Sequence, residues 1–281
     1  MSKPFGETDW RAMNQAQLDA GLNSGVAVAG SAEIGAGWVK SSEEIKAKHP
    51  DHLDLSYGPR ERNRFDFLKA AEGGPTLVLI HGGYWQMRSK DFFTCFAAGP
   101  MAHGINVAVV GYTLAPEATL DEIVAELHAS VDAVVAQSPK LGADPSRIVV
   151  SGWSAGGHLT ATTLTHPAVK GGVAISGIYD LEPIRHSYLN EKLKLDEAMA
   201  KRNSPLLQQG GPAAPLSLVV GGGELPLLRQ QTADLAAFRA AHGLPVSYEE
   251  IAGADHFSIM QQLESPAGRI TTLIKQMVER I

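Results

Sequence analysis

Three residues far apart in the chain carry side chains that together could cleave a carbonyl compound: Ser154, Glu224 and His256. A serine hydroxyl is a weak nucleophile at neutral pH, so it needs a base within hydrogen-bond reach and a third group that orients the base. Histidine suits the role of base because its pKa lies near working pH, and a carboxylate can accept its second N–H. The question is whether the surrounding segments can bring the three together.

Ser154 lies at the centre of Gly-Trp-Ser-Ala-Gly, residues 152–156, between an apolar β-branched run and a stretch of small residues and helix formers. This order predicts a strand, a sharp turn and a helix, which is the context of a nucleophile elbow. The flanking glycines let strand and helix pass closely while the serine is held in a strained conformation. We predict Ser154 as the nucleophile, with an ordinary small-residue turn as the alternative.

His256 is the predicted general base. It follows the expected strand Val246 to Ile251 and precedes the last expected helix. In a fold of this kind the chain order is nucleophile, acid and histidine, with the histidine after the final strand. His158 lies one helical turn beyond Ser154, so we predict that it packs inside the structure.

The acid should follow a strand that lies between the serine and the histidine in the sequence. Glu224 comes after the run Leu216 to Val220 and three glycines, and we predict that it orients the base. Asp180, which follows the preceding expected strand, stays open as an alternative acid. Asp255 is too close in sequence to fold back onto His256.

Backbone N–H groups are needed to stabilise the oxyanion that forms during attack on a carbonyl. Ala155 can supply one, because it directly follows the nucleophile. The others are expected from Gly82, Gly83 and Tyr84, in a loop whose glycines let amides face a cavity. We predict that His81 holds this loop by hydrogen bonds.

The elements that must position these residues alternate between short apolar runs and helical patterns, which favours a doubly wound, mostly parallel α/β sheet with helices on both faces. The expected strands are 65–68, 76–80, 107–111, 147–151, 173–176, 216–220 and 246–251. The expected helices are 9–22, 41–48, 90–101, 120–136, 155–164, 195–202, 227–242 and 258–280. We predict one domain, 1–281, with an N-terminal helical arm over 1–63 and a small cap insertion over about 177–214.

Composition excludes several other classes of function. With a net charge of −6 and 44% hydrophobic residues, the chain is not expected to bind nucleic acid or a membrane. We expect no cofactor and no metal, because there is no HExxH motif and the pair His49 and His52 has no third ligand. The absence of a secretory signal pattern and the single cysteine favour the cytoplasm. A homodimer stays possible.

In combination, these motifs resemble those of the α/β-hydrolase superfamily, and within it the kynurenine formamidase (arylformamidase) and hormone-sensitive-lipase-like esterase group. The similarity rests on His-Gly-Gly-Tyr-Trp at 81–85, Tyr-Thr-Leu-Ala-Pro at 112–116, the segment 152–159, Ser-Gly-Ile-Tyr-Asp-Leu at 176–181 and Asp-His-Phe at 255–257, and extends to Tyr57-Gly58 and residues 18–23. The resemblance implies the same triad and an oxyanion hole formed by the amides of Gly83, Tyr84 and Ala155. Tyr84 replaces a third glycine of lipase-like relatives, which favours the formamidase-like branch. Glu224 stands where formamidases more often have aspartate.

We therefore predict a serine hydrolase that acts through an acyl-enzyme intermediate on a small-molecule ester or formamide. Aromatic residues in or beside the loops of the site suggest an apolar or aromatic substrate, with a pocket formed by Trp85, Trp153, Tyr179 and Tyr188. Carboxylesterase activity is the first hypothesis and arylformamidase activity, the hydrolysis of N-formylkynurenine, is the alternative. A hydrolase-fold binding protein without catalysis is a second alternative.

Overall fold

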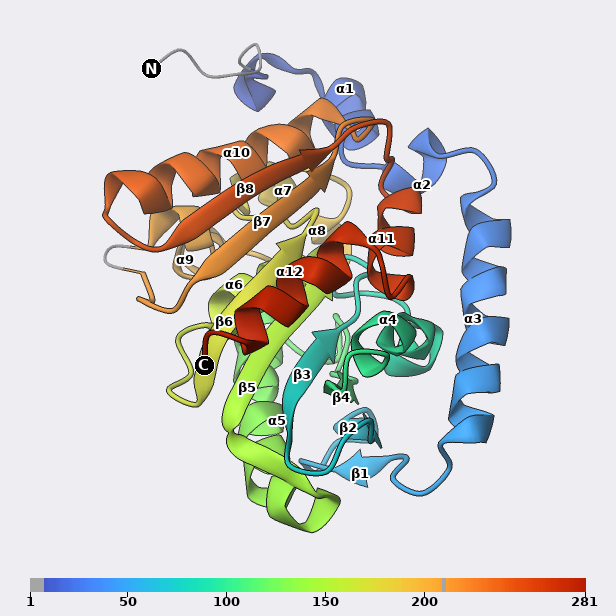
Figure 1. The fold of residues 1–281 in the computed structure, drawn as a ribbon. Coiled ribbons are helices and arrows are strands. Elements are labelled where there is room, and N and C mark those ends of the chain that lie inside the picture. Colours follow the sequence, from blue (N-terminus) through green and yellow to red (C-terminus); the bar gives the residue numbers. More distant parts are fainter. Residues whose placement is uncertain (1–7, 209–210) are drawn as a thin grey trace.

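The computed structural model describes residues 8–208 and 211–281, and within them eight strands form one sheet (Figure 1). Their order across the sheet is β1-β2-β4-β3-β5-β6-β7-β8. The strands are β1 (Leu55–Ser56), β2 (Arg64–Leu68), β3 (Gly74–Ile80), β4 (Asn106–Val110), β5 (Ala143–Trp153), β6 (Val169–Ile175), β7 (Leu216–Gly221) and β8 (Val246–Ile251). β2 pairs antiparallel with β1 and β4, and all other pairings are parallel. The predicted mostly parallel α/β sheet is confirmed.

The central strands are apolar along their length because both of their faces are covered. In β4, Ala108 and Val110 belong to one buried cluster, whereas Val107 and Val109 belong to the other. Successive side chains of a strand point to opposite faces, so a continuous apolar run is what a strand buried on both sides requires. This period of two explains why these strands could be found from sequence.

Helices cover the two faces of the sheet. One face packs against α5 (Leu120–Leu141), α6 (Ala155–Thr163) and α10 (Pro226–Ala241). The other packs against α3 (Ser31–Lys48), α4 (Ala98–Met101), α11 (Gln261–Glu264) and α12 (Arg269–Val278). Figure 1 shows α12 in front of the sheet and α5 behind it. The carboxyl ends of the parallel strands lead into the loops that connect the strands to the following helices.

Several helices differ from their predicted bounds. The helix expected at 41–48 is the last part of α3, which begins at Ser31 and continues through two glycines because the buried Trp38 anchors it. The helix expected at 258–280 is divided into the 3-10 turn η5 (Ser258–Met260), α11 and α12. The helix expected at 90–101 is instead two 3-10 turns, η2 (Lys90–Phe92) and η3 (Thr94–Ala97), followed by α4.

The N-terminal arm and the segment between β6 and β7 lie against each other at the carboxyl end of the sheet. This part of the arm contains the 3-10 turn η1 (Trp10–Ala12), α1 (Gln15–Gly21) and α2 (Ser24–Ala27). The rest of the predicted arm, 1–63, includes α3, which covers one face of the sheet, and β1, which is part of the sheet. The segment contains α7 (Glu182–Arg185), α8 (Asn190–Leu193), α9 (Glu197–Arg202) and η4 (Pro205–Leu207). Gln15 Nε2 donates to the carbonyl of His186 at 3.0 Å, and Asp19 Oδ1 accepts from the N–H of Tyr188 at 3.0 Å. Residues 1–7 of the expected arm and 209–210 of the expected cap lie outside the described residues.

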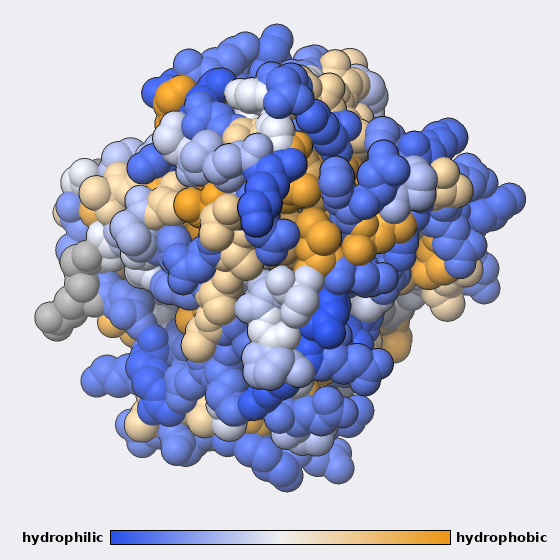
Figure 2. Space-filling view, turned by 90° about the horizontal axis from the view of Figure 1, so that it is seen from below, coloured by the Kyte–Doolittle hydropathy of each residue, from blue (hydrophilic) through white to orange (hydrophobic). Residues whose placement is uncertain are grey.

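The surface seen from below Figure 1 is mainly hydrophilic at its margin, with a broken band of hydrophobic residues across its middle (Figure 2). Over residues 8–208 and 211–281, no helix combines the length and apolar character needed to cross a membrane.

Candidate active site

Ser154 occupies a strained turn between β5 and α6. Its φ and ψ are 59° and −120°, values that a non-glycine residue rarely adopts. Its N–H donates to the carbonyl of Ile175 at 2.8 Å, which ties the turn to β6. A Cβ atom on Gly156 would lie only 2.2 Å from the carbonyl oxygen of Ile80, and one on Gly152 only 2.4 Å from that of Gly156. The two glycines are therefore required by the close passage of strand and helix.

His256 and Glu224 form a buried pair at the carboxyl end of the sheet. Nδ1 of His256 lies 2.6 Å from Oε2 of Glu224, and both residues are about 95% buried, with 4% and 5% exposed. The loop that carries the histidine is held by Asp255, whose Oδ1 accepts the N–H groups of Phe257 and Ser258 at 2.8 Å each. Trp153 Nε1 also donates to the carbonyl of His256 at 2.8 Å. The structure thus brings two of the three predicted catalytic side chains into direct contact.

Ser176 is a further partner of the carboxylate that the sequence analysis did not single out. Oε1 of Glu224 accepts a hydrogen bond from Ser176 Oγ and a second one from the N–H of Gly221 at 2.8 Å. Both bonds use the oxygen that does not face His256, so they fix the carboxylate in one orientation. The signal for Ser176 was its place at the end of β6, beside β7 in the parallel sheet.

The alternative acid Asp180 lies in another environment. Its Oδ1 accepts the N–H of Glu182 at 3.0 Å, and its own N–H donates to Gln231 at 2.8 Å. Burial raises the pKa of the Asp180 carboxyl. It borders a cavity with Trp10 and Arg11 of the arm, whereas Glu224 is the carboxylate that contacts His256.

The loop after β3 places its backbone beside the elbow. A Cβ atom on Gly82 would lie 3.1 Å from Cβ of Ser154, so only glycine leaves this approach open. Gly83, Tyr84 and Trp85 have φ values of 114°, 48° and 58°. Within the described part of the chain, no acceptor is paired with the backbone N–H groups of Gly83, Tyr84 or Ala155. Their role as donors to a substrate oxygen stays a prediction.

Two histidines near the elbow are buried and hold the surrounding loops. Nδ1 of His81 lies 2.8 Å from the carbonyl of Gly82, and its ring stacks on Tyr112 with centroids 4.2 Å apart. Nε2 of His158 lies 2.7 Å from the carbonyl of Asn203. Burial lowers the pKa of His81 to about 3 and that of His158 to about 4, so both rings are neutral at pH 7.

The two lowered pKa values predict an acid-sensitive fold. Above the unfolded-state pKa of about 6.5, neither ring affects the pH dependence of stability. As the pH falls below that value, the unfolded chain binds protons that the folded chain refuses, so the free energy of unfolding declines by up to about 1.4 kcal/mol per pH unit for each ring. Urea unfolding between pH 8 and pH 4 measures this slope. We expect a shallower slope for His158→Gln and no such change for the exposed His103→Gln; equal slopes in both variants would contradict the assignment.

Three of the four aromatic residues predicted to form the substrate pocket are buried. Trp85, Trp153 and Tyr179 are at most 1% exposed, so their rings belong to the packed interior beside the site. Trp153, for example, packs edge-on against Trp38 and lies beneath the guanidinium of Arg88. Their place in a substrate pocket stays a prediction, because an aromatic residue in a site loop can point into the core as easily as into a cavity.

One cavity adjoins the catalytic pair on the side of the N-terminal arm, and a second lies along the arm. The first, of about 520 Å³, lies between Ser24 and Ala27 on one side and Glu224 and His256 on the other. The second, of about 540 Å³, is bordered by α2 and by Tyr188, which is 44% exposed. Tyr188, one of the predicted pocket residues, lines this second cavity.

Comparisons with known proteins bear on the fold and the family of this chain. A family model described as alpha/beta hydrolase fold matches residues 77–209. Kynurenine formamidase of Danio rerio is 34% identical over 242 residues, which cover 80% of this chain and 81% of that protein. An isoprenylcysteine alpha-carbonyl methylesterase of Arabidopsis thaliana is 31% identical over 119 residues, covering 41% of this chain and 28% of that protein. A crystal structure from Silicibacter sp. tm1040, whose assignment as a thioesterase is provisional, superimposes with a TM-score of 0.84 at 30% identity and covers 92% of this chain and 99% of that one.

The fold and these relatives define the class: an enzyme of the esterase type with the α/β-hydrolase fold, rather than an inactive binding protein. More narrowly, the chain belongs to the kynurenine formamidase-like group of the α/β-hydrolase family.

Proposed function

We propose that this protein is an arylformamidase that hydrolyses N-formylkynurenine or a closely similar N-formyl arylamine. The observation that carries the proposal is the extent of the similarity to kynurenine formamidase, which runs through 80% of the chain. The similarity to a methylesterase is confined to 41% of it. A formamidase therefore matches about twice as much of the chain as this methylesterase does.

In the proposed mechanism, Ser154 Oγ attacks the formyl carbon while Nε2 of His256 removes the hydroxyl proton. Glu224 accepts the N–H at Nδ1, 2.6 Å away, and so stabilises the imidazolium that forms. The N–H groups of Gly83, Tyr84 and Ala155 receive the oxyanion.

The tetrahedral intermediate then collapses as His256 returns the proton to the arylamine nitrogen. The C–N bond breaks, the amine leaves, and the formyl group stays on Ser154 as an ester. Water, deprotonated by the same imidazole, attacks this ester, and its cleavage releases formate and restores the serine hydroxyl. No cofactor is needed for either half of the reaction.

The surroundings of the pair support a small acyl group and a larger leaving group. A Cβ atom on Gly82 would lie 3.1 Å from Cβ of Ser154, so the loop passes close to the nucleophile and limits the space beside it. The cavity of about 520 Å³ between the arm and the site offers room for an aromatic amine. Tyr188 borders a second cavity, of about 540 Å³, which shares Ala27 with the first.

Carboxylesterase activity is the second candidate. It is favoured by the 31% identity to a methylesterase over 119 residues. The same side chains would attack an ester carbonyl, and an alkoxide leaving group would need less help from His256 than an amine does.

A side-by-side assay separates the two candidates. We expect kcat/KM for N-formylkynurenine to exceed that for p-nitrophenyl acetate by at least about tenfold. Contacts with the correct leaving group that stabilise the transition state by about 1.4 kcal/mol are enough to produce a tenfold difference. Ser154→Ala protein serves as the blank for both substrates. Hydrolysis of the ester alone would move carboxylesterase activity to first place.

A further inference from the structure

The loop that would form the oxyanion hole needs support from outside itself. Four of its residues have positive φ: Gly83, Tyr84 and Trp85, and then Arg88 at 74°. Non-glycine residues keep such a conformation only where their surroundings impose it. A loop of this kind would relax, and its N–H groups would turn away from the nucleophile, if the contacts that hold it were lost.

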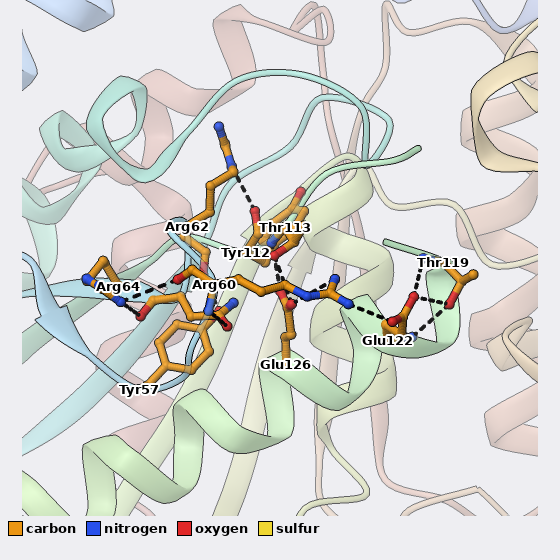
Figure 3. A network of polar contacts seen from close by, with 11 residues as sticks. Tyr57, Arg60, Arg62, Arg64, Tyr112, Thr113, Thr119, Glu122 and Glu126 are labelled. Carbon is orange, nitrogen blue, oxygen red and sulfur yellow. Dashed lines mark hydrogen bonds and ion pairs between the residues drawn. The ribbon is translucent and has the colours of Figure 1, made fainter. Parts of the chain in front are cut away.

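Arg62 makes two such contacts from a distant part of the chain. It lies in the loop before β2 and is half-buried. Its Nε donates to the carbonyl of Tyr112 at 3.0 Å, and its Nη2 donates to the carbonyl of Arg88. Figure 3 shows the Arg62 side chain extending from its loop to Tyr112. One guanidinium therefore joins the end of the strained loop to the segment that follows β4.

Tyr112 in turn holds the beginning of the same loop. Its hydroxyl donates to the carbonyl of His81 at 3.0 Å, and its ring stacks on that of His81. In the middle of the loop, the carbonyl of Trp85 accepts the N–H of Ala115 at 2.8 Å. Residues 81 to 88 are thus fastened at both ends to one segment, and Arg62 is the side chain that connects Tyr112 with the far end.

We propose that Arg62 is a positioning residue for the oxyanion hole. The inference rests on the proposed assignment of Gly83, Tyr84 and Ala155 as oxyanion donors. Arg62 acts through the backbone of the loop, and the planar fork of its guanidinium lets two donors reach two carbonyls at once. A lysine ammonium is a single point of charge on a flexible stem and cannot reproduce this geometry.

Arg60 supplies a matched control two residues away. Its guanidinium pairs with Glu122 at 2.6 Å and with Glu126 at 3.4 Å, both on α5 (Figure 3). None of the contacts described for the Arg60 side chain involves residues 81–88. Removing Arg60 therefore removes the same charge from the same loop without releasing the oxyanion loop.

The test compares Arg62→Met, Arg62→Lys and Arg60→Met by steady-state kinetics and thermal unfolding. Loss of one oxyanion donor lowers kcat by about 10²- to 10³-fold, and displacement of the loop should cost part of that. We expect kcat of Arg62→Met to fall by about 30-fold or more with KM changed less than about threefold. Arg62→Lys should recover only part of this loss, and Arg60→Met should stay within about twofold of wild type at a similar Tm.

Two further measurements keep the outcome clear. The rate of Ser154 phosphonylation by a fluorophosphonate should fall in Arg62→Met and not in Arg60→Met, while the pH dependence of kcat/KM keeps its shape because His256 and Glu224 are untouched. If Arg62→Met does not fold, Tyr112→Phe, which loses only the hydroxyl bond to His81, should show a smaller loss confined to kcat. Equal losses in the Arg60 and Arg62 variants, or a loss in KM alone, would overturn the proposal.

The substrate question does not affect this comparison. Both an ester and a formamide develop an oxyanion during attack. If the protein hydrolyses only p-nitrophenyl acetate, the proposed substrate is refuted, and the role of Arg62 in positioning the oxyanion hole can still be tested with that ester. If neither substrate is hydrolysed, the phosphonylation rates decide. A wild-type protein that the probe does not label would overturn the oxyanion hole and Arg62 together.

Discussion

Replacing Ser154 with alanine is expected to lower kcat by about 10⁵- to 10⁶-fold on whichever substrate the wild-type protein hydrolyses. Loss of the nucleophile in serine hydrolases removes the covalent route and leaves only the background that binding and oxyanion stabilisation provide. The fold should survive, because alanine can occupy the buried position and the backbone bond from residue 154 to Ile175 does not involve the side chain. Single-turnover kinetics together with a thermal unfolding curve measure both effects.

Ser151 offers the matched control for this substitution. It lies three residues earlier on β5, is fully buried, and donates from Oγ to the carbonyl of Val173 at 2.7 Å. Ser151→Ala should lower stability by about 1 kcal/mol through the lost hydrogen bond while kcat stays within a few-fold of wild type. Ser154→Ala protein that retains a tenth or more of the wild-type kcat would show that another residue is the nucleophile.

Replacing Glu224 with glutamine is expected to lower kcat by about 10³- to 10⁴-fold. One side-chain oxygen of Glu224 accepts from Ser176 and Gly221, so an amide would keep its oxygen there and turn its NH₂ group toward His256. Nδ1 would then have to accept a hydrogen bond, which places the imidazole proton on Nε2, where a base must be free. Steady-state kinetics measure the loss, and a folded protein with unchanged KM would locate the defect in the base.

Asp180→Asn is the control for the choice of acid. Asp180 accepts from the backbone of Glu182 and does not contact His256 among the contacts that the structure describes, so kcat should change less than about threefold. A large loss in Asp180→Asn combined with a small one in Glu224→Gln would reverse the assignment of the acid.

Local residue patterns were enough to predict the elbow, the sheet and the order of the three candidate side chains. The turn at Ser154 depends on glycines two residues away, where a Cβ would lie 2.4 Å or less from backbone atoms. Because these glycines are close to Ser154 in the sequence, the turn could be predicted from the local pattern. Buried parallel strands need continuous apolar runs, and their carboxyl ends meet at one edge of the sheet. Glu224 and His256 could therefore be placed near each other from the strands that precede them.

Contacts between distant segments depended on the tertiary structure. The sequence does not show that Trp85, Trp153 and Tyr179 are buried while Tyr188 borders a cavity. Whether an aromatic ring points into the core or away from it is decided only when the neighbouring helices pack. The length of α3, helical through glycines that weaken local propensity, follows from the burial of Trp38 against the core. Ser176 and Glu224 are 48 residues apart and Arg62 and Tyr112 are 50 apart, and no sequence pattern indicates that such distant residues form hydrogen bonds.

In this protein the sequence by itself determined where the reactive groups lie along the chain and which strands present them. Only the packing of segments remote in sequence decided what holds those groups in place and which aromatic side chains face a cavity, because burial and long-range hydrogen bonds are properties of the assembled fold.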